Sequence, residues 1–158
     1  MEPIRKKVDK ALQWFCLSIV AVMTVLVTYQ VITRYLFNAP SAVSEICARS
    51  LFVWLTMYGG AYVFGKRAHM NVEFVRSKLP PKIKTVVEMF SELVIAFFVV
   101  LIMIYGGFKQ ASNQMIQVEA ILQIPMGYIY SAIPIAGLLI LFYFFCNEAA
   151  LYKKLKNT

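Results

Sequence analysis

The charged residues, which could bind an ion or transfer a proton, lie outside four uncharged runs, and none lies inside one. The runs cover residues 11–33, 50–65, 93–108 and 120–147. An ionisable group in the middle of a membrane-spanning helix is costly, and therefore usually marks an ion pathway or a proton relay. Because these runs contain no such group, the sequence does not predict an ion pathway through the chain itself.

Glu92 is the acid that lies deepest. Only 16 residues separate it from Lys109, and a helix of that length spans about 24 Å, less than the roughly 30 Å of a hydrocarbon core. One of the two charges must therefore lie at the edge of the core. Two interpretations remain: a proton or sodium site at Glu92, or an interfacial carboxylate that pairs within the subunit or with a neighbour. We favour the second.

Glu45 and Arg49 lie one helical turn apart, where the second apolar run begins. A Glu four residues before an Arg has the favourable orientation for an ion pair on a helix. In solvent such a pair contributes only a few tenths of a kcal/mol. If it is partly buried, it would fix how the helix docks on other helices, because loss of one partner leaves a charge in a low dielectric. Both interpretations stay open.

Enzymatic chemistry is not indicated. His69 is the single histidine, so the axial pair of a membrane cytochrome and a complete nucleophile–base–acid set are both missing. The three cysteines are dispersed and show no metal-binding spacing. The sequence therefore predicts no catalytic residue, no metal site and no cofactor. The net charge of +8 does not indicate nucleic-acid binding, because the cations flank apolar runs, where lipid headgroups would face them.

The elements that position these residues are expected to be membrane helices. The chain is 60% apolar and only 15% charged, which is atypical of a soluble domain, and each run is long enough, or nearly so, to span a bilayer. We therefore predict an all-α integral membrane protein, a single domain over 1–158. Its four transmembrane helices are expected at about residues 11–34, 41–65, 85–110 and 128–148.

The distribution of cations predicts the orientation of these helices. Thirteen of the sixteen Lys and Arg lie before the first run, between the second and third, or in the C-terminal tail. The positive-inside rule then places both termini in the cytoplasm. The first run, 23 residues long, exceeds a cleaved signal and is expected to remain as an anchor.

Short amphipathic segments, at about residues 2–10 and 69–79, are expected to lie flat on the cytoplasmic surface. Their neighbourhood supplies the candidates for lipid-headgroup contact, which are Arg5, Lys6, Lys10, Arg76 and Lys82. We also predict that Ser41 caps the second helix and that Pro134 kinks the last one.

The order of several short motifs resembles a known family. The motifs are residues 34–40 (RYLFNAP), Ser44-Glu45, Ala48-Arg49, Trp54, 59–61 (GGA), 69–73 (HMNVE), 124–130 (IPMGYIY) and Pro134. Together they resemble the small permease subunit, of DctQ type, of tripartite ATP-independent periplasmic (TRAP) transporters. The chain departs from the common pattern in having Ile46 after Glu45, where a second acid is frequent, and Glu73, where Asp is frequent.

The resemblance implies a multi-pass protein of the bacterial inner membrane that acts with two partners. One is a large, elevator-type permease subunit, which would hold the sodium and organic-acid sites. The other is a periplasmic substrate-binding protein. The transported acid would be of the sialic acid or C4-dicarboxylate type, and the small subunit would be a stationary scaffold.

Two sets of candidate contact residues follow. For the subunit interface they are Arg34, Glu45, Arg49, Trp54 and Glu92, and for the periplasmic partner they are Asn38, Pro40, Ser44, Gln123 and Pro125. The alternative function is an autonomous four-helix carrier similar to the small multidrug exporters, although such a carrier needs an acid within a helix. A generic membrane assembly protein is a further alternative.

Overall fold

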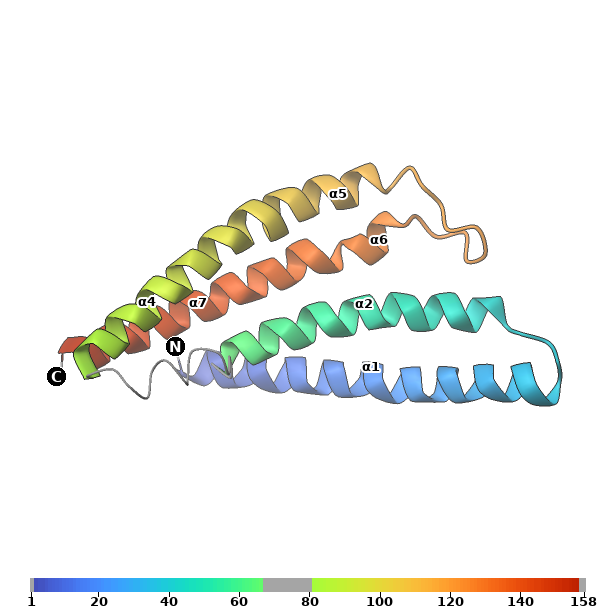
Figure 1. The fold of residues 1–158 in the computed structure, drawn as a ribbon, viewed down its shortest axis with the longest axis horizontal. Coiled ribbons are helices and arrows are strands. Elements are labelled where there is room, and N and C mark those ends of the chain that lie inside the picture. Colours follow the sequence, from blue (N-terminus) through green and yellow to red (C-terminus); the bar gives the residue numbers. More distant parts are fainter. Residues whose placement is uncertain (1, 67–80, 157–158) are drawn as a thin grey trace.

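The chain runs back and forth as helical rods joined at their ends. The computed structural model describes residues 2–66 and 81–156. Its helical elements are α1 (Glu2–Leu36), α2 (Ala42–Gly65), α4 (Pro81–Phe98), the π-helical η1 (Val99–Gly106), α5 (Gly107–Asn113), α6 (Gly127–Tyr130) and α7 (Ala132–Lys156). Because α4, η1 and α5 follow one another without a gap, they form a single rod, and α6 and α7 form the rod that returns beside it (Figure 1).

The first rod corrects one sequence-based expectation. Residues 2–10 do not form a separate segment, since α1 continues without a turn through residues 10 and 11. The reason is visible in the packing: Val8, Leu12 and Cys16, spaced four apart, all pack on the same buried cluster. This apolar stripe crosses the expected boundary and keeps the first turns of α1 against the neighbouring helices. The other expected amphipathic segment, 69–79, lies outside the described residues.

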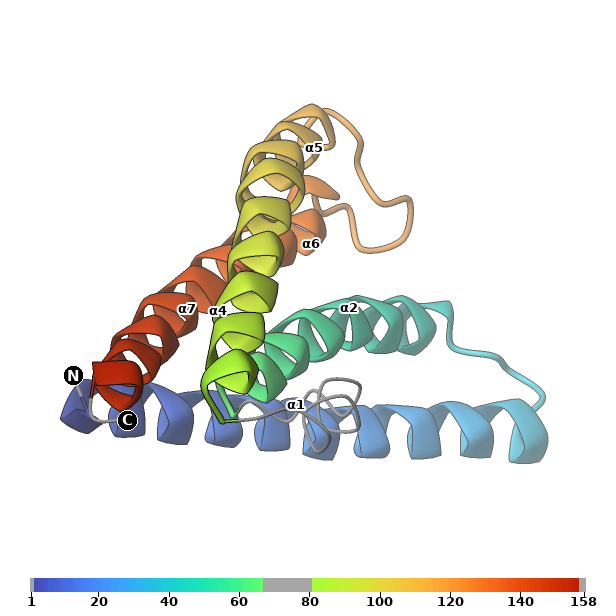
Figure 2. The same cartoon turned by 60° about the vertical axis from the view of Figure 1, so that its left-hand side comes forward.

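The helices form two hairpins that meet at one end. α1 packs on α2, α2 packs on α7, and α7 packs on α4 and η1. Both termini, the end of α2 and the start of α4 lie at the closed end, whereas the hairpins diverge toward the other end (Figures 1 and 2). Small residues line the helix contacts: Ala61, Ala132 and Ala136 are fully buried. Small side chains let helix backbones approach closely, which is how membrane helices associate.

Within the described residues, three helices are long and apolar enough to cross a membrane: Ile4–Leu36, Met89–Asn113 and Gly127–Ala149. The fourth expected crossing, α2, has 24 residues but is less apolar. It carries Glu45 and Arg49 near its start, and Trp, Tyr and Gly residues further along. Ser41 caps α2 as predicted, because its hydroxyl accepts a hydrogen bond from the Ser44 amide at 3.4 Å.

The last rod is interrupted close to the predicted kink. α6 ends at Tyr130 and α7 begins at Ala132, so the break at Ser131 lies one turn before Pro134. Proline has no amide hydrogen to donate and its ring disturbs the preceding turn. The helical hydrogen bonds resume one residue later, where the Ile135 amide donates to the Ser131 carbonyl at 3.3 Å.

Candidate functional site

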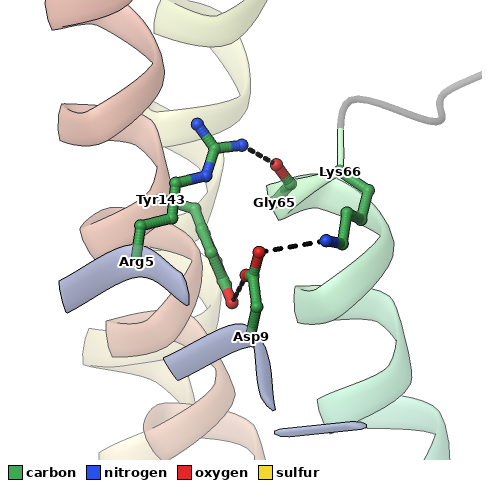
Figure 3. Close-up of polar contacts among 5 residues, drawn as sticks. All are labelled: Arg5, Asp9, Gly65, Lys66 and Tyr143. Carbon is green, nitrogen blue, oxygen red and sulfur yellow. Dashed lines mark hydrogen bonds and ion pairs between the residues drawn. The ribbon is translucent and has the colours of Figure 1, made fainter. Parts of the chain in front are cut away.

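The densest polar cluster of the described residues lies at the closed end and joins three helices. Asp9 of α1 accepts hydrogen bonds through both carboxylate oxygens. The Lys66 ammonium lies 3.0 Å from Oδ2, and the Tyr143 hydroxyl donates to Oδ1 at 2.6 Å (Figure 3). Beside them, the Arg5 guanidinium donates to the Gly65 carbonyl. We call these five residues the Asp9 junction.

Each contact in the Asp9 junction satisfies a group that would otherwise be costly. The Gly65 carbonyl belongs to the last turn of α2, where carbonyls have no partner within the helix, and Arg5 supplies one. Lys66 directly follows that turn, where a cation interacts favourably with the helix dipole. Its hydrogen bond to Asp9 raises the pKa of the Lys66 ammonium, so this group remains charged at neutral pH. The Asp9 junction is therefore a charge-assisted network.

The position of Tyr143 depends on Gly65. The Tyr143 side chain is fully buried, and a Cβ atom added at Gly65 would lie 2.6 Å from the Cε1 atom of its ring. Only a residue without a side chain lets α2 and α7 approach so closely. The hydroxyl of Tyr143 then reaches Asp9 on α1, which links the two hairpins.

This arrangement is suited to holding helices together. Both Asp9 oxygens are occupied by donors, one at the end of α2 and one on α7. Among the residues that the structure describes, no group of three or more His, Cys, Asp or Glu side chains could hold a metal ion.

At the divergent end, the expected ion pair is not formed. Within the described part of the chain, Glu45 and Arg49 make no ion pair with each other, and both side chains are exposed. Arg49 instead acts electrostatically on Glu119, in the loop between α5 and α6. Both side chains are exposed in the isolated chain, and an exposed pair gains little from forming. An interface role for the two residues stays a prediction.

Glu119 organises the loop that precedes α6. Its Oε2 atom accepts hydrogen bonds from the backbone amides of Ile121 and Leu122, at 2.8 and 2.9 Å. These hydrogen bonds, helped by Arg49, lower the pKa of the Glu119 carboxyl below its ordinary value of 4.5. The turn is therefore held by the ionised form of the side chain.

This turn should loosen in acid. Because the pKa of Glu119 is lower in the folded loop, its contribution is complete above pH 4.5 and is lost as the pH falls through the lowered value. We expect the amide chemical shifts of Ile121 and Leu122 to titrate with a midpoint below 4.5. In Glu119→Gln that titration should vanish, while other loop amides keep their shifts. Shifts that titrate equally in both proteins would contradict this assignment.

The candidates for the periplasmic partner have different environments. Asn38 and Pro40 are exposed, and Asn38 adopts a left-handed conformation with a φ of 48°. Ser44 is only 4% exposed and its hydroxyl donates to the Ser41 carbonyl. The helix cap uses the Ser44 hydroxyl, and contact of Ser44 with a partner stays a prediction. Gln123 is exposed, and Pro125 is half-buried opposite Val118.

The remaining candidates are dispersed. Arg34 is exposed in the last turn of α1, and Glu92 is half-buried on α4. Trp54 stacks on Tyr58 at a centroid distance of 5.4 Å, so part of its surface is used within the chain.

The candidates for lipid-headgroup contact also differ in their environments. Lys6 and Lys10 are exposed. The Arg5 guanidinium donates one hydrogen bond to the end of α2 in the Asp9 junction, and its contact with lipid stays a prediction. Arg76 and the side chain of Lys82 lie outside what the structure describes.

Sequence reasoning missed Asp9, Gly65 and Tyr143 as a cluster. The partners of Asp9 lie 57 and 134 residues away, and no local pattern connects positions so distant. One signal was available: Asp9 is an acid within a segment rich in lysine, and such an acid usually has a specific partner.

The chain is similar to known proteins over most of its length. Over residues 23–153 it matches the profile of a family described as tripartite ATP-independent periplasmic transporters, DctQ component. A putative TRAP transporter small permease protein of Haemophilus influenzae is 31% identical over 89% of this chain and 86% of that protein. The sialic acid TRAP transporter small permease protein SiaQ of Vibrio cholerae is 25% identical, over 90% of this chain and 82% of that protein.

A longer protein also matches. The sialic acid TRAP transporter permease protein SiaT of Haemophilus influenzae is 25% identical over 96% of this chain, but the match covers only 24% of that protein. This chain is thus similar to about a quarter of a larger permease.

Proposed function

Because this chain belongs to the DctQ family, the small permease component of TRAP transporters, we propose that it is a non-catalytic scaffold. In this role it holds the stationary part of a large, elevator-type permease subunit. The complex imports an organic acid together with sodium, and the sodium and substrate sites lie in the large subunit. A transport domain that slides through the bilayer needs a stationary subunit against which it can move.

The observation that carries this proposal is where the charges lie. In the described rods, no ionisable Asp, Glu, Lys or Arg lies within residues 11–33, 50–65, 93–108 or 132–147. At the closed end, Arg5 and Asp9 of α1 bind the Gly65 carbonyl and the Lys66 ammonium at the end of α2. A carrier that binds ions needs such groups near the midplane. Polar residues here connect helices, which suits a brace.

A large partner is supported by two independent facts. The long relative SiaT contains a segment similar to this chain within a protein about four times as long, and the remainder has the place of a large permease. The helices of this chain also expose apolar side chains, such as Val25 at 69% and Phe97 at 68%. Surfaces of this kind need lipid or protein to cover them.

The proposal includes four crossings in the bacterial inner membrane with both termini in the cytoplasm. The closed end contains both termini, and the two short loops lie at the opposite end (Figure 1). With the basic N-terminal segment, the positive-inside rule then favours a cytoplasmic closed end. We place α2 as the fourth crossing because it lies against α1 along the bundle. The loops at 37–41 and 114–126 would then face the periplasmic substrate-binding protein.

The substrate is proposed by class only. Two relatives carry sialic acid in their names, which supports a sugar acid, and a C4-dicarboxylate belongs to the same proposal. In both cases specificity would reside in the partners.

Reconstitution separates this function from an autonomous carrier. We expect vesicles that contain this chain, its cognate large permease and the binding protein to take up the acid in response to a sodium gradient. Vesicles with this chain alone should show only background uptake, since it provides no ion site. Affinity purification of a tagged chain should recover the large permease in equal amount. Accumulation of substrate by vesicles that contain only this chain would refute the scaffold role.

A further inference from the structure

A hollow at the closed end is lined mostly by residues to which the scaffold role assigns no function. Its volume is about 410 Å³, within the roughly 300–1,000 Å³ of ligand pockets. α1 and the residue that follows α2 line it, with Lys6, Asp9, Lys10, Gln13, Trp14, Leu17 and Lys66. We call this hollow the lysine pocket.

The lysine pocket has a surplus of positive charge. Its three ammonium groups face a single carboxylate, which leaves two positive charges. The carboxylate is Asp9, and its two oxygens are already engaged by Tyr143 and Lys66. Among the side chains that the structure describes, which do not include that of Glu2, no carboxylate forms an ion pair with Lys6 or Lys10. The pocket is therefore prepared for an anion with about two negative charges.

The residues of α1 in this pocket also change polarity in one direction. Lys6, Lys10, Gln13, Trp14 and Leu17 follow at steps of one, three or four residues, and so share one helix face. Over about 16 Å this face passes from ammonium groups through an amide and an indole to an aliphatic side chain. Trp14 and Leu17 are 60% and 56% exposed. Tryptophan is typical of the membrane interface, with cations outside it and aliphatic residues inside.

We propose that the lysine pocket binds an anionic phospholipid. Its phosphate groups lie between Lys6, Lys10 and Lys66, its ester region lies beside Gln13 and Trp14, and an acyl chain follows Leu17. A headgroup with two phosphates, as in diphosphatidylglycerol, matches the two surplus charges. Basic pockets beside membrane helices bind lipids of this class. A free phosphate would use the lysines but leave the indole and the leucine in water. The inference depends on the proposed membrane position of this end and not on the transport role.

Native mass spectrometry of the full chain in detergent tests this inference. The probes are diphosphatidylglycerol, phosphatidylcholine and inorganic phosphate, each titrated separately. We expect diphosphatidylglycerol to bind and phosphatidylcholine not to bind at the same concentrations. Lys6→Gln with Lys10→Gln should weaken diphosphatidylglycerol about 30-fold, at about 1 kcal/mol for each lysine. Both lysines are exposed and lie outside the Asp9 junction, so the fold should be kept.

Matched variants make the result specific. Arg34→Gln with Lys109→Gln removes the same charge at the opposite end and should leave the affinity unchanged. Lys6→Arg with Lys10→Arg keeps the charge and should retain binding. Trp14→Ala should weaken the lipid but not inorganic phosphate. An equal loss of lipid affinity in the Lys6/Lys10 double variant and in the Arg34/Lys109 double variant would overturn the proposal that the lipid binds in this pocket. Two results together would identify a free-phosphate site and overturn the proposal of a lipid site. Inorganic phosphate would displace the lipid, and Trp14→Ala would bind the lipid as tightly as the original chain does. Because the chain is measured alone, failure of transport would not affect either outcome.

Discussion

Gly65→Ala should lower the stability of the isolated chain by about 1–3 kcal/mol, the range for an overfilled core. The added methyl group would lie 2.6 to 2.8 Å from three atoms of the Tyr143 ring. The ring has nowhere to move, because Tyr143 is fully buried and its hydroxyl is bound to Asp9. The helices α2 and α7 must therefore separate, and the contact between the two hairpins weakens.

Gly60→Ala is the matched control, at a glycine five residues earlier on α2. A Cβ atom at Gly60 would meet nothing within 4 Å, and alanine is favoured over glycine inside a helix by about 1 kcal/mol. This variant should be as stable as the original chain or slightly more stable. The two substitutions add the same methyl group to the same helix, so any difference between them reports the contact with Tyr143.

Thermal unfolding in detergent, followed by far-UV circular dichroism, measures both variants. For a chain of this size each kcal/mol corresponds to roughly 2–4 °C in Tm. Gly65→Ala should cost less in a Tyr143→Leu background than in the original chain, because the smaller side chain makes room for the methyl group. A Gly65→Ala protein that unfolds at the same temperature as Gly60→Ala would contradict the close packing at this position.

The positions of the helices could be predicted from the sequence because their signals are local. The second helix was expected at 41–65 and is found at Ala42–Gly65, since a serine cap and an apolar run define it. Where only a charged residue marks the end of an apolar run, the predicted end of the helix was less accurate. The last helix was expected to end at 148, yet α7 continues to Lys156 with Leu151 buried at 2% exposure. Hydropathy locates the membrane segment, whereas capping and packing decide where the helix ends.

The residues of the site could be predicted only in part. The loop positions Asn38, Pro40 and Gln123 are exposed, and their contact with a partner stays a prediction. The Asp9 junction could not be predicted, because its members lie 57 and 134 residues apart in sequence and meet only in the folded chain. A glycine at the end of one helix and a tyrosine in the middle of another acquire their roles only when the helices meet. Glu45 and Arg49 illustrate the converse, since favourable spacing does not make an ion pair in solvent.

Asp9 and Tyr143 should be energetically coupled by about 1–2 kcal/mol. Tyr143→Phe keeps the ring and removes the hydroxyl, which leaves the Oδ1 atom of Asp9 without its donor. Asp9→Asn removes the charge that both Tyr143 and Lys66 require. Each variant alone should cost about 1–3 kcal/mol. The double variant should cost less than the sum, because the shared hydrogen bond is lost only once.

The matched control for this cycle is Tyr58→Phe. Tyr58 is a second buried tyrosine, 8% exposed, on α2, and its hydroxyl forms no hydrogen bond within the described residues. Its combination with Asp9→Asn should be additive to within about 0.5 kcal/mol. Both cycles are measured by the same thermal unfolding. If the free energies add in both, the Asp9–Tyr143 contact does not contribute to stability. Coupling in the first cycle alone would mean that one carboxylate fixes the first hairpin to the second. A scaffold needs such a fixed joint, because a brace whose halves can separate transmits no resistance to the subunit that moves beside it.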